Sequence, residues 1–405
     1  MDFEILILGT DVNAYYLARC YHEAFGKKAT LLGKAPLNPT ALSGILNIRY
    51  DGHIWTEQGF IDALFDYKKA VQGKPVLLIS SNETYAGFIT SNSEKLKAAG
   101  FLFNYPQMSV CESLMYKQDF YKTYQNSILN LPETFYFDCQ KDTEIPKVSS
   151  YPVILKPSNV IMYNHLSFEG KNKIYKIKSE TELIKTVNTV KAAGYTDTLI
   201  IQDFIPGDDS RLFDAVAYVN SDGKTEFLSF AQIGLQEHSR SMVGNAAVLI
   251  NGYNEFGGTK EITDRLRTFL EDINYRGFAE FDLKYDERDN KFKVLEINAR
   301  QGRSSYYVSA LGKNLVKVLV DDLINKKENE YELLDKKVLL SFVNKSIIKK
   351  YIKNPQFKKE ALSLMKKGYV NPIKYRADSS FKYNLYLLKR DYNYKKAYKN
   401  GYWKE

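Results

Sequence analysis

Apolar and polar positions alternate in blocks through the N-terminal part of the chain. Residues 3–9 are almost entirely apolar and end at Gly9, which is typical of a buried strand, and apolar positions at helical spacing follow from about Val12 to Phe25. The alternation continues with strand-like runs at 45–50 and 75–80 and a helix-like run at 59–71. Strands separated by helices at this spacing predict a parallel sheet. We therefore expect an N-terminal α/β domain over residues 1–108. The turn after Gly9 lacks a glycine-rich dinucleotide fingerprint, and is either a plain turn or the edge of a pocket.

The pattern becomes mixed beyond this domain. It predicts helices over 109–127 and 259–273, and a further helix that begins at the capping box Ser179–Glu182 and ends at Gly194. It also predicts a strand that ends at Lys156 and Pro157, a strand at 199–201, and a hairpin with its turn at 220–223. Residues 158–172 are polar and aromatic, which predicts a loop. Predicted helices and strands thus continue beyond the N-terminal domain over residues 109–335.

The most informative segment lies at the end of this region. It has β-type alternation on both sides of a polar turn at 286–290. Asp282 and Glu296 are equally far from the middle of the turn, so a hairpin that closes there sets the two carboxylates opposite each other. Because side chains alternate along a strand, Asn298 and Arg300 share the face of Glu296.

Opposed like charges destabilise a strand pair, so this face favours a cation between the carboxylates. Mg²⁺ takes carboxylate and amide oxygens, usually together with substrate phosphates. We therefore expect a metal–phosphate site here. A solvated acidic hairpin is the alternative.

Two lysines are candidates for phosphate contacts, because an ammonium group acts as a point charge for phosphate oxygens. Lys117 lies in the predicted helix 109–127, and Lys156 ends an apolar strand, where an unpaired charge would be costly. A solvated surface position is the ordinary alternative for any single lysine.

Composition adds few constraints. Hydrophobic residues make up 44% and charged residues 26% of the 405 positions, as in globular proteins. The acidic N-terminus does not resemble a secretory signal, and no apolar run has the length of a membrane span. Three scattered cysteines without a C-x-x-C motif indicate reduced thiols and a cytoplasmic location. Four isolated histidines give no zinc signature.

Charge is distributed unevenly along the chain. Residues 336–405 carry 19 Lys/Arg and 4 Asp/Glu, a balance of +15, whereas residues 1–335 have a balance of −6. The basic clusters of this C-terminal extension lie at 349–350, 358–359, 366–367, 389–390 and 395–396, among Tyr351, Tyr369, Tyr383, Tyr386, Tyr392, Tyr394, Tyr398 and Tyr402. Such a segment suits peripheral contact with an anionic membrane surface. A solvated or partly helical appendage is the alternative. No nucleic-acid module is recognisable, and we expect no nucleic-acid partner.

Three segments resemble the ATP-grasp superfamily of carboxylate–amine ligases. They are Ile201-Gln-Asp-Phe-Ile-Pro-Gly-Asp-Asp-Ser210, Gly277-Phe-Ala-Glu-Phe-Asp-Leu-Lys-Tyr-Asp286 and Glu296-Ile-Asn-Ala-Arg-Gln-Gly-Arg-Ser-Ser305. Within the superfamily, the chain looks most like the D-aspartate ligases of Gram-positive peptidoglycan synthesis. The resemblance implies a parallel-sheet domain followed by an ATP-grasp fold of two α+β subdomains that grip ATP. It implies a central lid subdomain over about 150–205, and it leaves 336–405 as an extension.

The resemblance also implies roles for individual residues. The nucleotide-binding positions of the family match Lys117 and Lys156 for the phosphates, Gln202, Asp203, Phe204 and Ile205 for the adenine, and Asp209 for the ribose. The magnesium ligands match Asp282, Glu296 and Asn298. Arg300 matches the arginine beside the transferred phosphoryl group, so that Arg300 and Lys156 are the implied catalytic residues.

An amino-acid donor with a second carboxylate needs a cationic anchor. Arg300 and Arg303 are the candidates, with the hydroxyl groups of Ser304 and Ser305 beside them. The alternative for Arg303 is that it braces its own loop. The chain also departs from the family, because residues 158–171 contain only Gly170 where many members have a glycine-rich phosphate lid. Asn159, His165 and Lys171 are candidates for that function.

The implied cofactors are ATP and Mg²⁺. The implied reaction activates a carboxylate as an acyl phosphate and joins it to an amine, with D-aspartate as the donor and the lysine side chain of a peptidoglycan precursor as the acceptor. A ligase for another amino acid or carboxylate and another amine, as in polysaccharide decoration, and a nucleotide-binding protein without turnover are the alternatives.

Overall fold

The computed structural model describes residues 2–238 and 244–401, and the chain divides into two units. Unit 1 consists of Met1–Cys111, Asp208–Asp282 and Ile297–Glu405, and unit 2 consists of Glu112–Gly207 and Leu283–Glu296. The predicted N-terminal domain and the C-terminal extension therefore both fall within unit 1. The chain passes between the units at four points, and Asp282 and Glu296 are each the last residue before such a point.

The first sheet of unit 1 is the predicted parallel sheet. Its strands are β1 (Glu4–Leu8), β2 (Ala29–Gly33), β3 (Leu46–Tyr50), β4 (Val76–Ser80) and β5 (Phe101–Leu102), in the order β3-β2-β1-β4-β5. The helices between them are α1 (Val12–Phe25), α2 (Glu57–Ala70), α3 (Glu83–Ser91) and α4 (Ser93–Ala98), with the 3-10 turn η1 (Thr40–Leu42). The side chain of Asp11 caps α1, and Gly26 ends it in the left-handed conformation. Helices on both faces explain why β1 and β4 are almost wholly apolar.

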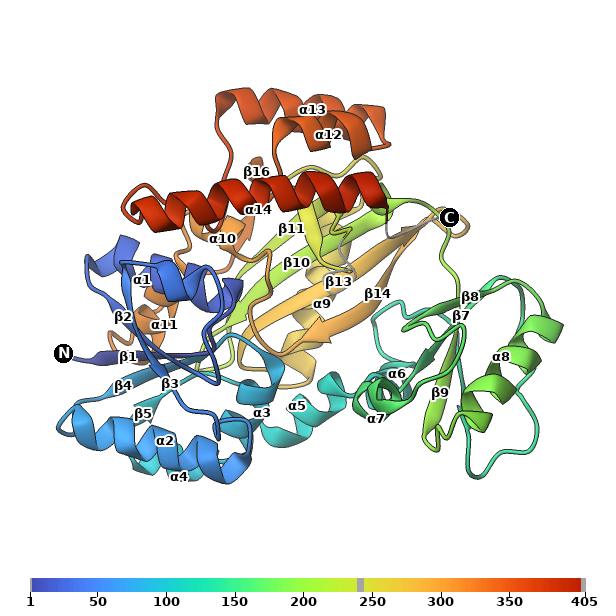
Figure 1. The fold of residues 1–405 in the computed structure, drawn as a ribbon, viewed down its shortest axis with the longest axis horizontal. Coiled ribbons are helices and arrows are strands. Elements are labelled where there is room, and N and C mark those ends of the chain that lie inside the picture. The colour runs from blue at the N-terminus through green and yellow to red at the C-terminus, as the bar shows by residue number, and fades with distance from the viewer. Residues whose placement is uncertain (1, 239–243, 402–405) are drawn as a thin grey trace. The chain divides into compact units, whose positions relative to one another are not determined.

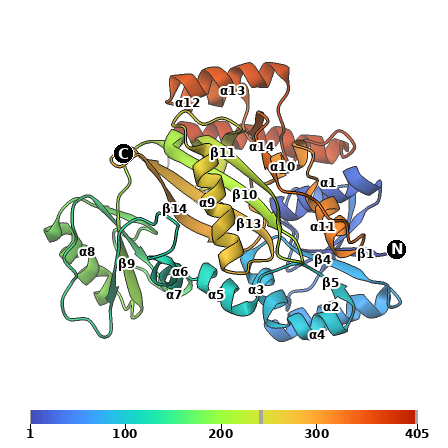
Figure 2. The ribbon, with the colours of Figure 1, turned by 180° about the vertical axis from the view of Figure 1, so that it is seen from behind.

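The second sheet contains the predicted hairpin. Its strands are β10 (Leu212–Val219), β11 (Thr225–Gln236), β12 (Ala246–Asn251), β13 (Gly277–Asp286), β14 (Lys291–Asn298), β15 (Glu332–Leu334) and β16 (Val338–Ser341), in the order β14-β13-β10-β11-β12-β16, with β15 beside β11. Figure 2 shows α9 (Thr259–Asp272) lying across this sheet. The remaining short elements are α10 (Tyr306–Ala310), α11 (Leu315–Leu323) and the 3-10 turn η2 (Asp209–Arg211). The expected hairpin is confirmed, since β13 and β14 are neighbours joined by a turn at 287–290.

Unit 2 is built on a smaller antiparallel sheet. Its strands are β6 (Thr134–Asp138), β7 (Val153–Pro157), β8 (Tyr175–Ile177) and β9 (Thr198–Asp203), in the order β6-β9-β7-β8. The helices of this part of the chain are α5 (Met108–Met115), α6 (Lys117–Tyr124), α7 (Val160–His165) and α8 (Glu180–Ala192). The capping box before α8 is half formed. The Ser179 hydroxyl accepts a hydrogen bond from Glu182 N, but the Glu182 carboxylate accepts from Lys178 N.

Two predictions for this region were wrong. The single helix expected over 109–127 is divided into α5 and α6, because Tyr116 has an extended backbone. No glycine or proline marks this break in the sequence. The loop expected over 158–172 contains the short helix α7, whose first turn is capped by the side chain of Asn159.

The C-terminal extension folds into unit 1, as Figure 1 shows. Its helices are α12 (Lys345–Tyr351), α13 (Pro355–Lys367) and α14 (Phe381–Asn400), each with an Asn or Ser side chain as N-cap. Phe357 and Tyr398 are buried in one apolar cluster with residues of β11, β12 and β16. Gly234 in β11 is required by this packing, because a Cβ there would lie 1.9 Å from the Phe357 ring. Tyr402 lies outside the described residues.

We predict that Phe357→Ala lowers the free energy of unfolding by about 3–5 kcal/mol, because a buried aromatic ring is replaced by a cavity. Denaturant unfolding of the full chain measures this change. Tyr392→Ala on the exposed side of α14 is the control and should change stability by less than about 0.5 kcal/mol. Equal stability of the Phe357 variant and the control would contradict the integration of the extension into unit 1.

Candidate active site

Arg300 lies beyond the end of β14 in unit 1 and is held by carboxylates. Its Nη2 donates to Glu83 Oε1 at the start of α3 (2.9 Å), and its Nη1 faces Glu280 Oε2 at 3.9 Å. Its buried Nε has no acceptor among the described residues. A buried donor of this kind is expected where a ligand supplies the acceptor. The two carboxylates thus hold the guanidinium in place, and one of its buried N–H groups has no partner among the described residues.

A pair of buried carboxyl groups lies behind Arg300. Burial raises the pKa of Glu280 well above its usual range, and the nearby charges of Asp214 and Asp282 raise it further. Burial also raises the pKa of Asp214, which is hydrogen bonded to Glu280, Ser304 and Tyr307. Ionisation of both groups is therefore unfavourable, because two adjacent buried carboxylates repel each other.

The Ser304 hydroxyl is hydrogen bonded to this carboxyl pair: it donates to Asp214 and lies 3.2 Å from Glu280 Oε1. Ser304 is therefore placed in the interior of unit 1. The pair also explains the glycine of the Glu296–Ser305 segment. A Cβ at Gly302 would lie 1.5 Å from Glu280 Oε1, so that a side chain at this position would displace the carboxyl group.

Arg303 is buried and paired. Its Nη2 lies 2.7 Å from Glu237 Oε1, and its guanidinium lies 4.0 Å from the centre of the Phe342 ring. Its Nε, like that of Arg300, has no hydrogen-bond partner within the described part of the chain. Arg303 is thus packed within unit 1.

The two predicted phosphate lysines lie together in unit 2. Lys117 begins α6 and forms an ion pair with Glu296 at the end of β14. Lys156 Nζ donates to Gln202 Oε1 (3.0 Å) and to the Tyr121 hydroxyl (3.3 Å), and lies 4.8 Å from the centre of the Tyr121 ring. The register of β7 and β9 explains the contact between Lys156 and Gln202. Lys156 is paired with Ile200 and Gln202 with Ile154, so that Lys156 and Gln202 are diagonal neighbours on the same face of the sheet.

The pKa of Lys156 is strongly perturbed. Burial of the ammonium group and repulsion from Lys117 lower this pKa to about 7, although Glu296 acts in the opposite direction. A lysine that is only partly charged at neutral pH in the free protein is unusual outside functional sites. An anion beside it would restore the full charge.

The predicted adenine segment runs out of β9. The Asp203 carboxylate is taken by an ion pair with Arg288 in the turn of the hairpin, which leaves the backbone for the predicted adenine contact. Two cations lie near the ring of Phe204, with Lys176 Nζ at 4.1 Å and Lys284 Nζ at 5.5 Å from its centre. Ile205 is buried. This segment thus combines apolar side chains with nearby positive charge.

The predicted ribose and metal residues differ in how they are held. The Asp209 carboxylate accepts hydrogen bonds from the backbone N and the side-chain amide of Gln236, both at 2.8 Å. Asp282 lies close enough to Glu280 for its charge to raise the pKa of Glu280. Asn298 Oδ1 lies 3.5 Å from Arg300 Nη2. No group of three or more His, Cys, Asp or Glu side chains placed to hold a metal ion occurs within the described ranges.

The three lid candidates are used in other ways. Asn159 caps α7, Lys171 Nζ donates to the backbone oxygens of Asn164 and Leu166, and His165 is exposed in the last turn of α7. These contacts stabilise the segment itself.

Several residues of the site were missed in the sequence. Tyr121 and Arg288 become visible only through contacts across the fold of unit 2. Glu280 had a signal, because it precedes Asp282 by two positions on one strand and therefore shares its face. No sequence signal indicates Asp214 or Glu83, because each lies far along the chain from its partner, Ser304 and Arg300 respectively.

We predict that nucleotide binding at pH 8 is accompanied by uptake of about one proton at Lys156, because phosphate oxygens favour the ammonium form. The folded pKa of about 7 lies below the pKa in the complex, so affinity is highest below pH 7 and weakens as the pH rises above it. Isothermal titration calorimetry in two buffers of different ionisation enthalpy measures the uptake. Lys156→Met should abolish it, and Lys122→Met, on an exposed lysine of α6, should not. Equal uptake by both variants would contradict the assignment.

No protein-family model matches the chain. It is 32% identical to the D-aspartate ligase of Enterococcus faecium (strain Aus0004), over 97% of this chain and 95% of that protein.

Among solved structures, it is similar in fold to an L-amino acid ligase from Bacillus licheniformis (TM-score 0.56, 17% identity, covering 80% of this chain and 74% of the other). It is also similar to the biotin carboxylase domain of 2-oxoglutarate carboxylase from Hydrogenobacter thermophilus in complex with ADP, its magnesium salt and bicarbonate (TM-score 0.59, 15% identity, covering 81% and 71%). The expected fold is thereby confirmed. The chain is an ATP-dependent carboxylate–amine ligase of the ATP-grasp superfamily and belongs to the family of the Enterococcus D-aspartate ligase.

Proposed function

We propose that this ligase joins D-aspartate, through its β-carboxylate, to the lysine side chain of a peptidoglycan stem-peptide precursor. The observation that carries the proposal is the similarity to a D-aspartate ligase along almost the whole of both chains. The site is compatible with such a donor. Two arginines close together in sequence, Arg300 and Arg303, each keep one buried donor without an acceptor among the described residues, which suits a substrate with two carboxylates.

In the proposed reaction, the donor carboxylate attacks the γ-phosphate of ATP and gives an acyl phosphate and ADP. The acceptor amine then attacks the acyl carbon, phosphate leaves and an amide remains. Transfer of a phosphoryl group depends mainly on positioning and on neutralising the oxygens. We assign this work to Lys117, Lys156 and Arg300, with Gln202–Ile205 and Asp209 holding the nucleoside. No side-chain nucleophile is required.

We propose Asp282, Glu296 and Asn298 as the residues that hold Mg²⁺. Two carboxylates and one amide oxygen fit a hard cation whose remaining ligands are water and phosphate oxygens. When bound, Mg²⁺ neutralises charge on the phosphate oxygens. The ion pair between Lys117 and Glu296 orients this carboxylate beforehand.

We predict that D-aspartate gives the highest rate of phosphate release among D- and L-amino acids, measured with ATP, Mg²⁺ and a lysine-containing stem peptide. Arg300→Lys should lower kcat/KM for the donor by about 100-fold, because the planar guanidinium is replaced by a point charge. Arg265→Lys, on an exposed ion pair of α9, is the control. A strong preference for an unrelated acid would overturn the proposed donor, although the ligase assignment would stand.

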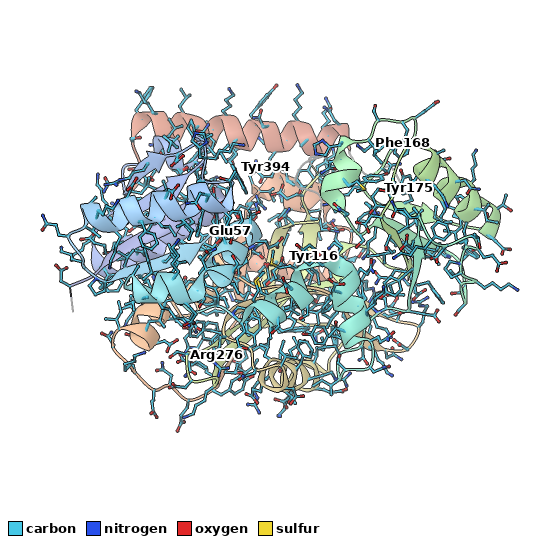
Figure 3. The ribbon with its side chains drawn as sticks, turned by 90° about the horizontal axis from the view of Figure 1, so that it is seen from below. Glu57, Tyr116, Phe168, Tyr175, Arg276 and Tyr394 are labelled. Atoms are coloured by element: carbon cyan, nitrogen blue, oxygen red, sulfur yellow. The ribbon has the colours of Figure 1, made fainter. Side chains whose placement is uncertain are left out.

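We also propose that the protein is cytoplasmic and touches an anionic membrane surface through α14. Within residues 2–238 and 244–401, no helix has the length and apolar character needed to cross a membrane. The outward side of α14, where Figure 3 shows a row of side chains standing away from the helix, includes exposed apolar residues at helical spacing: Phe381, Leu385, Leu388 and Tyr392. Phe381 is 83% and Leu388 68% exposed.

Exposed lysines accompany this apolar stripe, at Lys382, Lys389, Lys395, Lys396 and Lys399. The acidic residue of the helix, Asp391, is paired with Lys374. An apolar stripe flanked by lysines suits the surface of an anionic bilayer, where each basic residue contributes about 1 kcal/mol.

We predict that the full chain floats with vesicles containing anionic lipid and not with neutral vesicles. Phe381→Glu combined with Leu388→Glu should remove this binding, because charged groups replace the apolar stripe. These substitutions avoid truncation, which would remove helices that pack into unit 1. The double change Ile184→Glu and Ile174→Glu, at other exposed apolar positions, is the control. Flotation of both double variants alike would contradict the proposal.

A further inference from the structure

The inner side of α14 holds the end of strand β11. The Tyr398 hydroxyl donates to the backbone oxygen of Gln236 (2.5 Å), and the ring of His238 stacks on Tyr398 with the centroids 4.4 Å apart. The Tyr394 hydroxyl donates to Glu237 Oε1 at 2.6 Å. Figure 3 labels Tyr394 on this inner side. Three successive residues of the strand end are thus fixed by two tyrosines of one helix.

The Tyr394 hydroxyl that donates to Glu237 is also hydrogen bonded to Arg303. The hydroxyl accepts hydrogen bonds from Arg303 Nη2 (3.1 Å) and from Arg390 Nη2 (2.7 Å) while it donates to Glu237. Glu237 is only 1% exposed and pairs with Arg303 at 2.7 Å. One phenol therefore joins two guanidinium groups and a buried carboxylate. Buried charges of this kind need all their partners, because a lost partner leaves an uncompensated charge.

Tyr398 reaches Asp209 through Gln236. Asp209 accepts from both the backbone N and the side-chain amide of Gln236, whose carbonyl oxygen is the acceptor for Tyr398. The position of Asp209 therefore depends on the path of the strand at this residue. Tyr398 is buried, so this hydrogen bond is protected from water.

We propose that Tyr394 and Tyr398 are positioning residues of the ligase, each for a different substrate. Tyr394 orients Arg303 toward the donor carboxylate, and Tyr398 holds Asp209 at the ribose of ATP. This inference rests on the roles proposed above for Arg303 and Asp209. It makes the C-terminal extension a part of the catalytic apparatus, because small displacements of positioning groups have large effects on rate.

Steady-state kinetics of Tyr394→Phe and Tyr398→Phe in the full chain test this inference. Tyr394→Phe should raise KM for the donor amino acid about tenfold and leave KM for ATP within about twofold, since it removes a hydrogen bond to charged groups at one substrate only. Tyr398→Phe should show the reverse pattern. Tyr369→Phe, which changes an exposed phenol of the same extension, is the control.

A second substitution tests the same connection from the strand. Glu237→Gln keeps a hydrogen-bond acceptor for Tyr394 and removes the charge, and it should again raise KM for the donor selectively. Unchanged KM values together with a lowered melting temperature would show that α14 only stabilises the fold, and would overturn the proposal. Equal increases in both KM values would also overturn it. The donor is the acid preferred by the wild-type protein, so a preference for an acid other than D-aspartate would not affect this test.

Discussion

A charge that is removed from water must be paired, and this constraint organises both units of the protein. In unit 2, Lys117 is paired with Glu296, and Lys156 is supported by the polar atoms of Gln202 and Tyr121. In unit 1, Arg300 is held by Glu83 and Glu280. The groups that we propose to bind the phosphates are therefore oriented in advance, which is the main requirement for catalysis of phosphoryl transfer.

Local signals in the sequence predicted several elements of the fold, whereas the partners of the buried charges could not be predicted. Period-two alternation and a polar turn were enough to predict the hairpin of β13 and β14, since both signals are local. The parallel sheet of unit 1 was predictable for the same reason. The division between α5 and α6 at Tyr116 carries no glycine or proline, and so has no local signal. The partners of the buried charges are equally hidden, because Glu83 and Arg300 are brought together only by the fold.

The C-terminal extension illustrates the limit of composition as evidence. Its basic and tyrosine-rich sequence indicated a separate segment, yet its tyrosines serve two different surfaces of one helix. Tyr394 and Tyr398 face β11 and form hydrogen bonds to charged or backbone groups, whereas Tyr392 is exposed among lysines. Charge counts do not distinguish these positions. Helical spacing does, once the beginning of α14 at Phe381 is known.

The central claim is that Glu296, Asp282 and Asn298 bind magnesium at the phosphates of ATP. An experimental structure of the full chain with Mg²⁺ and a non-hydrolysable ATP analogue tests it most directly. The account predicts a metal ion coordinated by these three side chains, with Lys117 moved from Glu296 to a phosphate oxygen. A nucleotide bound elsewhere, or a metal ion held by other residues while the pair of Lys117 and Glu296 stays intact, would contradict it.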